Sequence, residues 1–231
     1  MRRLSVAFAV LMFVGLCAPA SSYAQQSLNL YVGGFVPDDI NSRGHDDVLR
    51  NNTDFLAFDI HDFSSITAGG EYLVGLGNFL EGGLGVGIYQ DTVPSVYWDY
   101  VNENGSEIDQ DIKLRMVPFS ATVRLLPIGR SNGIEPYVGG GVAIINWHYS
   151  ESGEFVDFTD GSIFNDTFEA SGTSVGPTIL GGVRIPIGSW NFGGEIRWQD
   201  AKGDLPSNLG FAGDKIDLGG FNYLVTFGVK F

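Results

Sequence analysis

A histidine and a serine two positions apart are the strongest candidates for covalent chemistry in this sequence. His148 and Ser150 flank Tyr149, and residues two apart in a strand share one face. A carboxylate added to such a pair completes the arrangement used for acyl transfer. Glu151 and Glu154 follow directly. The pair is therefore a candidate for acyl-transfer chemistry.

The tripeptide resembles the His-x-Ser motif of the lipid A 3-O-deacylases, which are eight-stranded barrels. This chain has Glu151 where those enzymes have an asparagine, and the motif precedes a long acidic stretch rather than lying late in the chain. Residues 150–171 contain no Lys or Arg that could hold an anionic lipid. We therefore interpret His148 as a rim residue and expect no catalytic residues, with an acyl hydrolase as the weakest alternative.

The charge balance and the cysteine count exclude several function classes. The chain has 27 acidic and 13 basic residues, so nothing in it could neutralise nucleic-acid phosphates. Asp157, Asp160 and Asp166 offer oxygen ligands, but they lack the spacing of a calcium-binding loop. We expect no cofactor and no dedicated metal site, and the binding of divalent cations by the acidic segments stays an open question.

The first 24 residues have the pattern of a secretory signal. Arg2 and Arg3 precede an apolar run over residues 6–16, and Ser22-Tyr23-Ala24 is a small-x-small cleavage site. The single cysteine, Cys17, falls inside this segment. We therefore predict a signal peptide over 1–24 and one exported domain over 25–231, without disulfide or thiol chemistry.

The exported domain alternates apolar and polar residues, which is typical of strands with two different faces. Short connections at 77–78, 127–133 and 188–189 alternate with long ones at 37–62, 92–111, 150–171 and 201–214. The long connections and their edges contain 23 of the 27 acidic residues. The predicted strands cover 28–36, 63–76, 79–91, 112–126, 134–149, 172–187, 190–200 and 215–231.

This organisation predicts an all-β fold. The expected architecture is an eight-stranded antiparallel up-and-down transmembrane β-barrel with short periplasmic turns and four long extracellular loops. Trp190 and Trp198 share a face near the two ends of one strand. Their separation of about 20 Å along a tilted strand suits the two edges of a membrane's apolar band. A soluble lipocalin-like barrel, with its apolar face inward, is the alternative.

The opposite face of the predicted strands contains three acids and three bases. Since a barrel of this size is just filled by side chains, we expect these charges to pair in the lumen and close it. A narrow gated pore for small solutes or ions is the alternative that they leave open. Bulges could shift this parity in the fourth to sixth strands, where Lys113 and Arg115 fall on the lipid side. The predicted inward charges are Glu71, Glu81, Arg124, Arg184, Glu195 and Arg197.

Two motifs and the C-terminus carry a family resemblance. Residues 117–124 (VPFSATVR) and 135–141 (EPYVGGG) are similar to the fourth and fifth strands of the small OmpA-like outer-membrane β-barrel domain family. The last strand resembles the signal read by the barrel assembly machinery, and we expect no peptidoglycan-binding domain after it. Its apolar face consists of Tyr223, Val225, Phe227, Val229 and Phe231.

The resemblance implies a monomeric barrel in the outer membrane of a Gram-negative bacterium, in contact with outer-membrane lipid and lipopolysaccharide. It does not imply one activity, because members of that family serve as structural proteins, adhesins, immune-evasion proteins or narrow pores. We expect a structural or surface-interaction role through the acidic extracellular loops, with an unidentified surface ligand.

Overall fold

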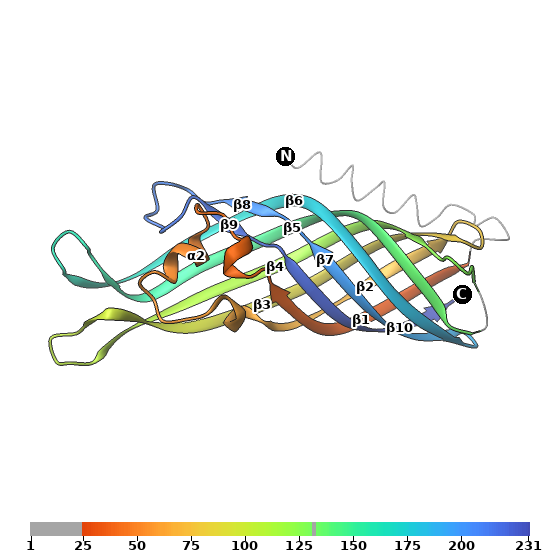
Figure 1. Cartoon of the computed structure of the whole chain (residues 1–231), viewed down its shortest axis with the longest axis horizontal. Helices are drawn as coiled ribbons and strands as arrows, with labels where there is room; N and C mark the ends of the chain where they lie inside the picture. Colours follow the sequence, from red (N-terminus) through yellow and green to blue (C-terminus); the bar gives the residue numbers. More distant parts are fainter. Residues whose placement is uncertain (1–24, 131–132) are drawn as a thin grey trace.

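Eight long antiparallel strands form a closed barrel in the computed structural model, which describes residues 25–130 and 133–231 (Figure 1). The predicted signal peptide lies outside these described residues. Each strand pairs with its neighbours in the chain, and the first strand closes the ring against the last. The predicted eight-stranded antiparallel up-and-down barrel is confirmed. The strands are β1 (Gln26–Pro37), β2 (Ser65–Gly75), β3 (Leu80–Val101), β4 (Glu107–Leu125), β5 (Glu135–Val156), β6 (Ile163–Ile187), β7 (Trp190–Gln199) and β10 (Gly220–Lys230).

Four of the strands extend far beyond the other four at one end of the barrel. β3 and β4 stay paired out to Val101, and β5 and β6 stay paired out to Val156 (Figure 1). The prediction that residues 92–111 and 150–171 are loops is therefore wrong for most of their length. Their outward positions are acidic and look like loops, but inward positions such as Ile108 and Ile112 are fully buried, which keeps the chain in strands.

The last barrel strand begins later than the sequence pattern predicts. Residues 215–217 belong to a separate short strand, β9 (Lys215–Asp217), which pairs with β8 (Lys202–Asp204) in a two-stranded sheet. The break falls before Gly220, whose φ is +154°. A Cβ there would lie 2.3 Å from the carbonyl oxygen of Val36. Only glycine fits this approach of the two backbones.

The segment between β1 and β2 contains three single turns of helix. They are η1 (Ile40–Ser42), α2 (Val48–Asn52) and η2 (Ile60–Phe63). Asp47 caps α2, because its side chain accepts a hydrogen bond from the Arg50 backbone N–H. None of the helices in the described ranges is long and apolar enough to cross a membrane.

The outer surface of the barrel has an apolar belt. The side chains that the sequence analysis placed on the outward face of each strand do face outward. Lys113 and Arg115 also point outward, just beyond this belt, and Leu114 between them is buried. Most side chains of the belt are about half exposed, because no protein covers them. The apolar belt includes Leu28, Leu30, Val32, Leu84, Val86, Ile88, Phe119, Val123, Val138, Val142, Ile144, Ile179, Val183, Ile185, Phe192, Ile196, Phe221, Tyr223 and Val225.

Inward tyrosines lie flat against glycines in the barrel wall. Tyr31 crosses Gly69, where a Cβ would come within 2.4 Å of the tyrosine oxygen. Tyr31 also donates a hydrogen bond of 3.2 Å to the carbonyl oxygen of Val86 on β3. The glycine-rich strands thus make room for aromatic rings in a lumen that is too narrow to hold them upright.

Candidate functional site

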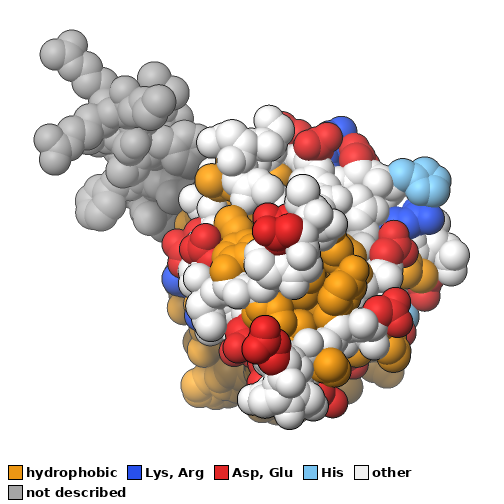
Figure 2. Space-filling view, turned by 90° about the vertical axis from the view of Figure 1, so that its left-hand side faces the viewer, with side chains coloured by type: hydrophobic (Ala, Val, Ile, Leu, Met, Phe, Trp, Pro, Cys, Tyr) orange, Lys and Arg blue, Asp and Glu red, His pale blue; other side chains and the backbone are white. Residues whose placement is uncertain are grey.

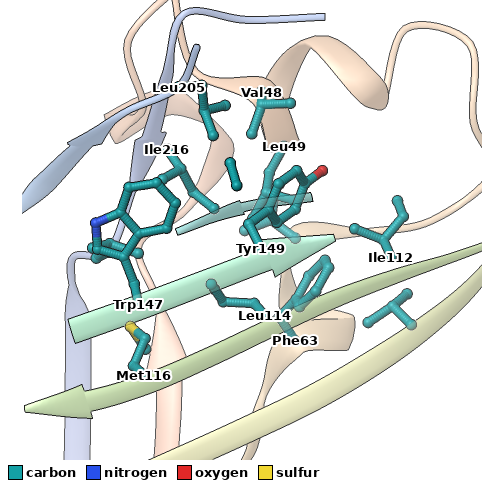
Figure 3. Close-up of a cluster of buried hydrophobic side chains, with 14 of the residues drawn as sticks. Val48, Leu49, Phe63, Ile112, Leu114, Met116, Trp147, Tyr149, Leu205 and Ile216 are labelled. Atoms are coloured by element: carbon teal, nitrogen blue, oxygen red, sulfur yellow. The ribbon is translucent and has the colours of Figure 1, made fainter. Parts of the chain in front are cut away.

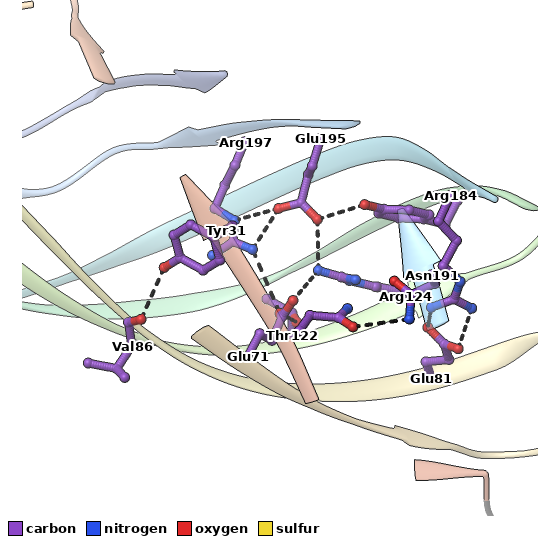
Figure 4. Close-up of polar contacts among 12 residues, drawn as sticks. Tyr31, Glu71, Glu81, Val86, Thr122, Arg124, Arg184, Asn191, Glu195 and Arg197 are labelled. Atoms are coloured by element: carbon purple, nitrogen blue, oxygen red, sulfur yellow. Dashed lines mark hydrogen bonds and ion pairs between the residues drawn. The ribbon is translucent and has the colours of Figure 1, made fainter. Parts of the chain in front are cut away.

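The lumen contains a network of paired charges in its short-turn half (Figure 4). At one centre, the Arg124 Nη2 donates to the carboxylates of both Glu71 and Glu195, the latter at 2.7 Å. Arg197 donates to the second oxygen of Glu195 at 2.6 Å. Tyr137 donates to Glu195 at 3.0 Å, and its ring lies 4.7 Å from the Arg124 guanidinium. Four strands on different sides of the barrel are thereby tied across the lumen.

A second centre surrounds Arg184, nearer to the short turns. Its guanidinium donates to Glu81 at 2.6 and 3.0 Å and to Glu135 at 2.6 Å. Arg130 lies 3.2 Å from Glu81, and Lys230 lies 3.8 Å from Glu135. Arg184, Glu81 and Glu135 are almost fully buried. The two centres therefore block the lumen with ion pairs rather than lining an open passage.

The structure brings together all six charges that the sequence assigned to the lumen. It adds Glu135 and Tyr137 to the network, which the sequence reasoning left out. Alternation alone could have found both, because Val138 faces outward and its neighbours at odd positions in that strand must face inward. Four acidic residues lie outside the long acidic segments, and Glu135 is the one of them that is not among the six predicted inward charges.

Between the charge network and the outer half of the lumen there is space for little more than one water. A cavity of about 20 Å³ lies there, lined by residues that include Tyr31, Ser120, Thr178, Arg197 and Asn222. One water molecule needs about this volume. The middle of the barrel is thus filled by its own side chains, as expected for eight strands.

The outer half of the lumen is apolar and filled by segments from outside the barrel wall (Figure 3). The wall supplies side chains such as Met116 and Trp147, and the segment before β2 supplies Val48 and Leu49 from α2. We call the inserted residues, 38–64 and 201–218, the cover. The buried apolar side chains from the cover are Val48, Leu49, Leu56, Ile60, Phe63, Ala201, Leu205, Ile216 and Leu218. This apolar core is a second closure of the lumen.

A buried ion pair joins the two parts of the cover. The Arg43 Nη1 donates to Asp47 at 3.1 Å and to the carbonyl oxygen of Asp217 at 3.2 Å. Asp47 in turn accepts the Asp217 backbone N–H at 2.6 Å. The segment before β2 and the strand β9 are therefore held as one unit over the outer mouth.

One buried carboxylate fixes the cover to the barrel wall beyond the apolar belt. Glu151 accepts hydrogen bonds from Asn52 of α2 at 2.7 Å and from Tyr149 at 2.6 Å. No ion pair reaches Glu151 in the described part of the chain. Burial raises the pKa of Glu151 above its ordinary value of 4.5, although its two hydrogen bonds oppose that shift.

The raised pKa of Glu151 predicts that the cover loosens as pH rises. Because the folded chain binds this proton more tightly than the unfolded chain, folding stability is highest at and below pH 4.5 and falls as pH rises through the folded pKa. Hydrogen-exchange protection of the α2 amides should therefore fall from pH 4.5 to pH 8 in the natural chain. Glu151→Gln should make this fall smaller, although Asp38 of the cover, whose pKa is also raised by burial, still titrates. An equal fall in the variant would contradict the assignment.

The candidate catalytic pair lies on the outer surface of β5. His148 faces outward, and Ser150 is buried between its neighbours Lys113 and Glu169 on the adjacent strands. In the described chain no hydrogen bond joins His148 to Ser150. Glu151 points into the barrel, so it lies on the wrong face to complete a triad. Among the described residues the Ser150 side chain has no hydrogen bond to a general base, which is the contact that activates a serine nucleophile.

The two tryptophans and the last strand lie where the sequence placed them. Trp190 and Trp198 face outward at opposite ends of β7, and Trp190 stacks on Phe227 with ring centroids 5.0 Å apart. The apolar side chains of β10 also face outward, and the terminal Phe231 is exposed. Their roles at the membrane interface and in assembly stay predictions.

The acidic residues near the strand tips do not gather into a metal site. Asp157, Asp160 and Asp166 each accept a hydrogen bond from a backbone N–H one or two residues away. Within the described residues no group of three or more His, Cys, Asp or Glu side chains is placed to hold a metal ion.

Comparison with known proteins finds similarity only among solved structures. No family model matches the chain, and no curated protein matches it. The N-terminal barrel domain of Pseudomonas aeruginosa OprF is 12% identical over 89% of this chain and 97% of that one, with a TM-score of 0.45. Neisserial surface protein A is 12% identical over 90% and 99%, with a TM-score of 0.47.

The attachment invasion locus protein Ail of Yersinia pestis is 10% identical over 90% of this chain and 99% of that one, with a TM-score of 0.45. These three solved structures are eight-stranded outer-membrane barrels of the OmpA-like type. The closed barrel itself rests on the strand pairing of this chain.

Proposed function

We propose that this chain is an integral outer-membrane protein of a Gram-negative bacterium with a structural or surface-interaction role. The observation that carries this proposal is the double closure of the lumen. Ion pairs block one half, and the apolar core under the cover fills the other half. A barrel closed in this way does not conduct, so its function lies in the surface that it displays.

The apolar belt supports a membrane position. Side chains such as Val32 of β1, Val123 of β4 and Ile179 of β6 are exposed around the barrel, and contact with the acyl chains of lipid and lipopolysaccharide would cover them. The closed ring leaves no strand edge within the belt for a second subunit, which favours a monomer. The exposed apolar face of β10 is the part that the barrel assembly machinery would read.

The acidic extensions of β3 to β6 then project outside the cell. At roughly 3.3 Å per residue and a tilt near 40°, the stretch from Asn146 to Asp157 reaches about 30 Å beyond the apolar belt. These extensions and the cover are the part of the chain that can meet a partner.

Cysteine labelling of intact cells tests this placement, because the exported chain has no cysteine of its own. Asp160 at the β5–β6 tip and Asn78 in a short turn are both exposed. A membrane-impermeant maleimide should label Asp160→Cys on intact cells, and should label the matched control Asn78→Cys only after the outer membrane is permeabilised. The unboiled protein should also migrate differently from the boiled protein on a gel.

Two results would overturn the proposal. Recovery of the protein from the soluble periplasmic fraction without a heat-dependent shift would favour the lipocalin-like alternative. Labelling of Asn78→Cys but not of Asp160→Cys on intact cells would reverse the orientation and bury the acidic surface in the periplasm.

A further inference from the structure

Four aromatic rings meet where the two extended hairpins approach each other. Phe158 at the β5–β6 tip lies 5.8 Å from Tyr100 and 6.4 Å from Tyr97 of β3, measured between ring centroids. Phe55 of the cover lies 5.6 Å from Phe158 and stacks on Tyr97 at 5.8 Å. Three segments that are distant in the sequence thus build one aromatic surface. We call these four residues the tip face.

Part of the tip face is open to solvent. Phe158 is 61% exposed and Tyr100 is 40% exposed, whereas Tyr97 beneath them is buried. Viewed from the outer end, hydrophobic side chains gather in the middle and acidic side chains surround them (Figure 2). Large aromatic side chains that are exposed at the end of a projecting hairpin lower the solubility of a protein. Exposed apolar patches of this kind mark interaction sites.

The charge around the tip face is of one sign. Residues 91–111 and 150–171 contain eleven acidic residues besides the buried Glu151, and no Lys or Arg. None of these eleven acids takes part in an ion pair in the described part of the chain. The acids are Asp91, Asp99, Glu103, Glu107, Asp109, Asp111, Glu154, Asp157, Asp160, Asp166 and Glu169.

We propose that the tip face docks a polypeptide segment rich in Lys and Arg. The ring faces attract a cationic side chain through their quadrupoles, most strongly for Arg. The surrounding carboxylates raise the local concentration of such a segment and speed its encounter. This inference rests on the proposed function, because the tips must face the outside to meet such a partner.

Other occupants fit the surface less well. A second copy of this chain would bring the same uncompensated negative charge to the contact, and an anionic lipid headgroup would be repelled in the same way. A divalent cation would leave the rings without a contact, and the Asp157 and Asp160 carboxylates are already turned toward their own backbone. Of these occupants, only a cationic segment makes favourable contacts with both the aromatic rings and the carboxylates.

Fluorescence polarisation tests the proposal with the full mature barrel in nanodiscs of zwitterionic phosphatidylcholine. The probe is a fluorescein-labelled peptide of alternating arginine and glycine, and the same peptide with glutamate in place of arginine is the negative probe. The natural chain should bind the arginine peptide and not the glutamate peptide. Tyr100→Leu with Phe158→Leu, which keeps apolar bulk but removes two ring faces, should weaken binding about tenfold.

Phe164→Leu is the matched control, since Phe164 is 40% exposed in the same acidic hairpin but stacks on Phe155 outside the tip face. It should change the affinity less than twofold. Equal affinities for the natural chain and the Tyr100/Phe158 variant would overturn the proposal in favour of diffuse charge attraction, as would absence of binding to the natural chain. Ion conductance through the barrel would instead count against the proposed function, whatever the peptide does.

Discussion

The Arg124→Met barrel is expected to be less stable than the natural barrel by about 3–5 kcal/mol, because the substitution leaves buried carboxylates without their cation. Arg124 is 2% exposed and lies between Glu71 and Glu195. Glu195 keeps its ion pair with Arg197 at 2.6 Å, but Glu71 keeps only a 3.7 Å contact to Arg197 and a 3.3 Å hydrogen bond from Thr122. Urea unfolding in lipid vesicles, followed by the heat-dependent gel shift, measures this loss.

A double variant separates the loss of the ion pair from the loss of packing. Arg124→Met with Glu71→Gln removes the carboxylate that has lost its partner and leaves Glu195 paired with Arg197. The double variant should be at least about 1 kcal/mol more stable than the sum of the two single effects predicts. Strict additivity, or a single-variant loss below about 1 kcal/mol, would show that the charge network does not stabilise the barrel.

Leu49→Asp is expected to release the cover while the barrel stays intact. Leu49 is fully buried in the apolar core, and an unpaired carboxylate there costs about 3 kcal/mol or more. The variant should therefore expose Arg43 and Arg50, which are buried and half-buried in the natural chain. Trypsin should cleave vesicle-bound protein at these sites about 100-fold faster, because each 1.4 kcal/mol is a factor of ten.

The matched control for this cleavage is Ile40→Asp. It adds the same charge to the same segment, but Ile40 is already 36% exposed, so its rate of cleavage should stay within about threefold of the natural rate. The heat-dependent gel shift of Leu49→Asp should be unchanged, since the charge network and the pairing among the eight barrel strands do not involve the cover. Loss of that shift would mean that the cover is part of the barrel's stability rather than a separate closure.

The barrel and its lumen could be predicted from the sequence because successive side chains of a strand point to opposite faces of the sheet. Parity placed Glu71, Arg124 and Glu195 on one face of three different strands, and closing the ring brought them together. The same rule would have placed Glu135 beside Arg184. Glu135 is the first residue of its strand, so only the positions that follow it, such as Val138, show that it faces inward.

The outer half could not be predicted in the same way. Val48 and Leu49 lie in a helix of five residues, which is too short to show a helical period. Their burial depends on contacts with Ile112 and Tyr149, about 60 to 100 residues away in the sequence. The extended parts of β4 and β5 could not be recognised as strands either, because their outward positions are acidic. A segment with many carboxylates between apolar residues looks like a solvated loop.

Planar-bilayer recording of the purified, refolded barrel tests the central claim most directly. With the lumen closed by ion pairs in one half and an apolar core in the other, the natural chain should insert without giving conductance steps. Leu49→Asp should also stay closed, because the charge network remains in place when the cover is released. Stable ohmic steps from the natural chain would contradict the account and favour a pore.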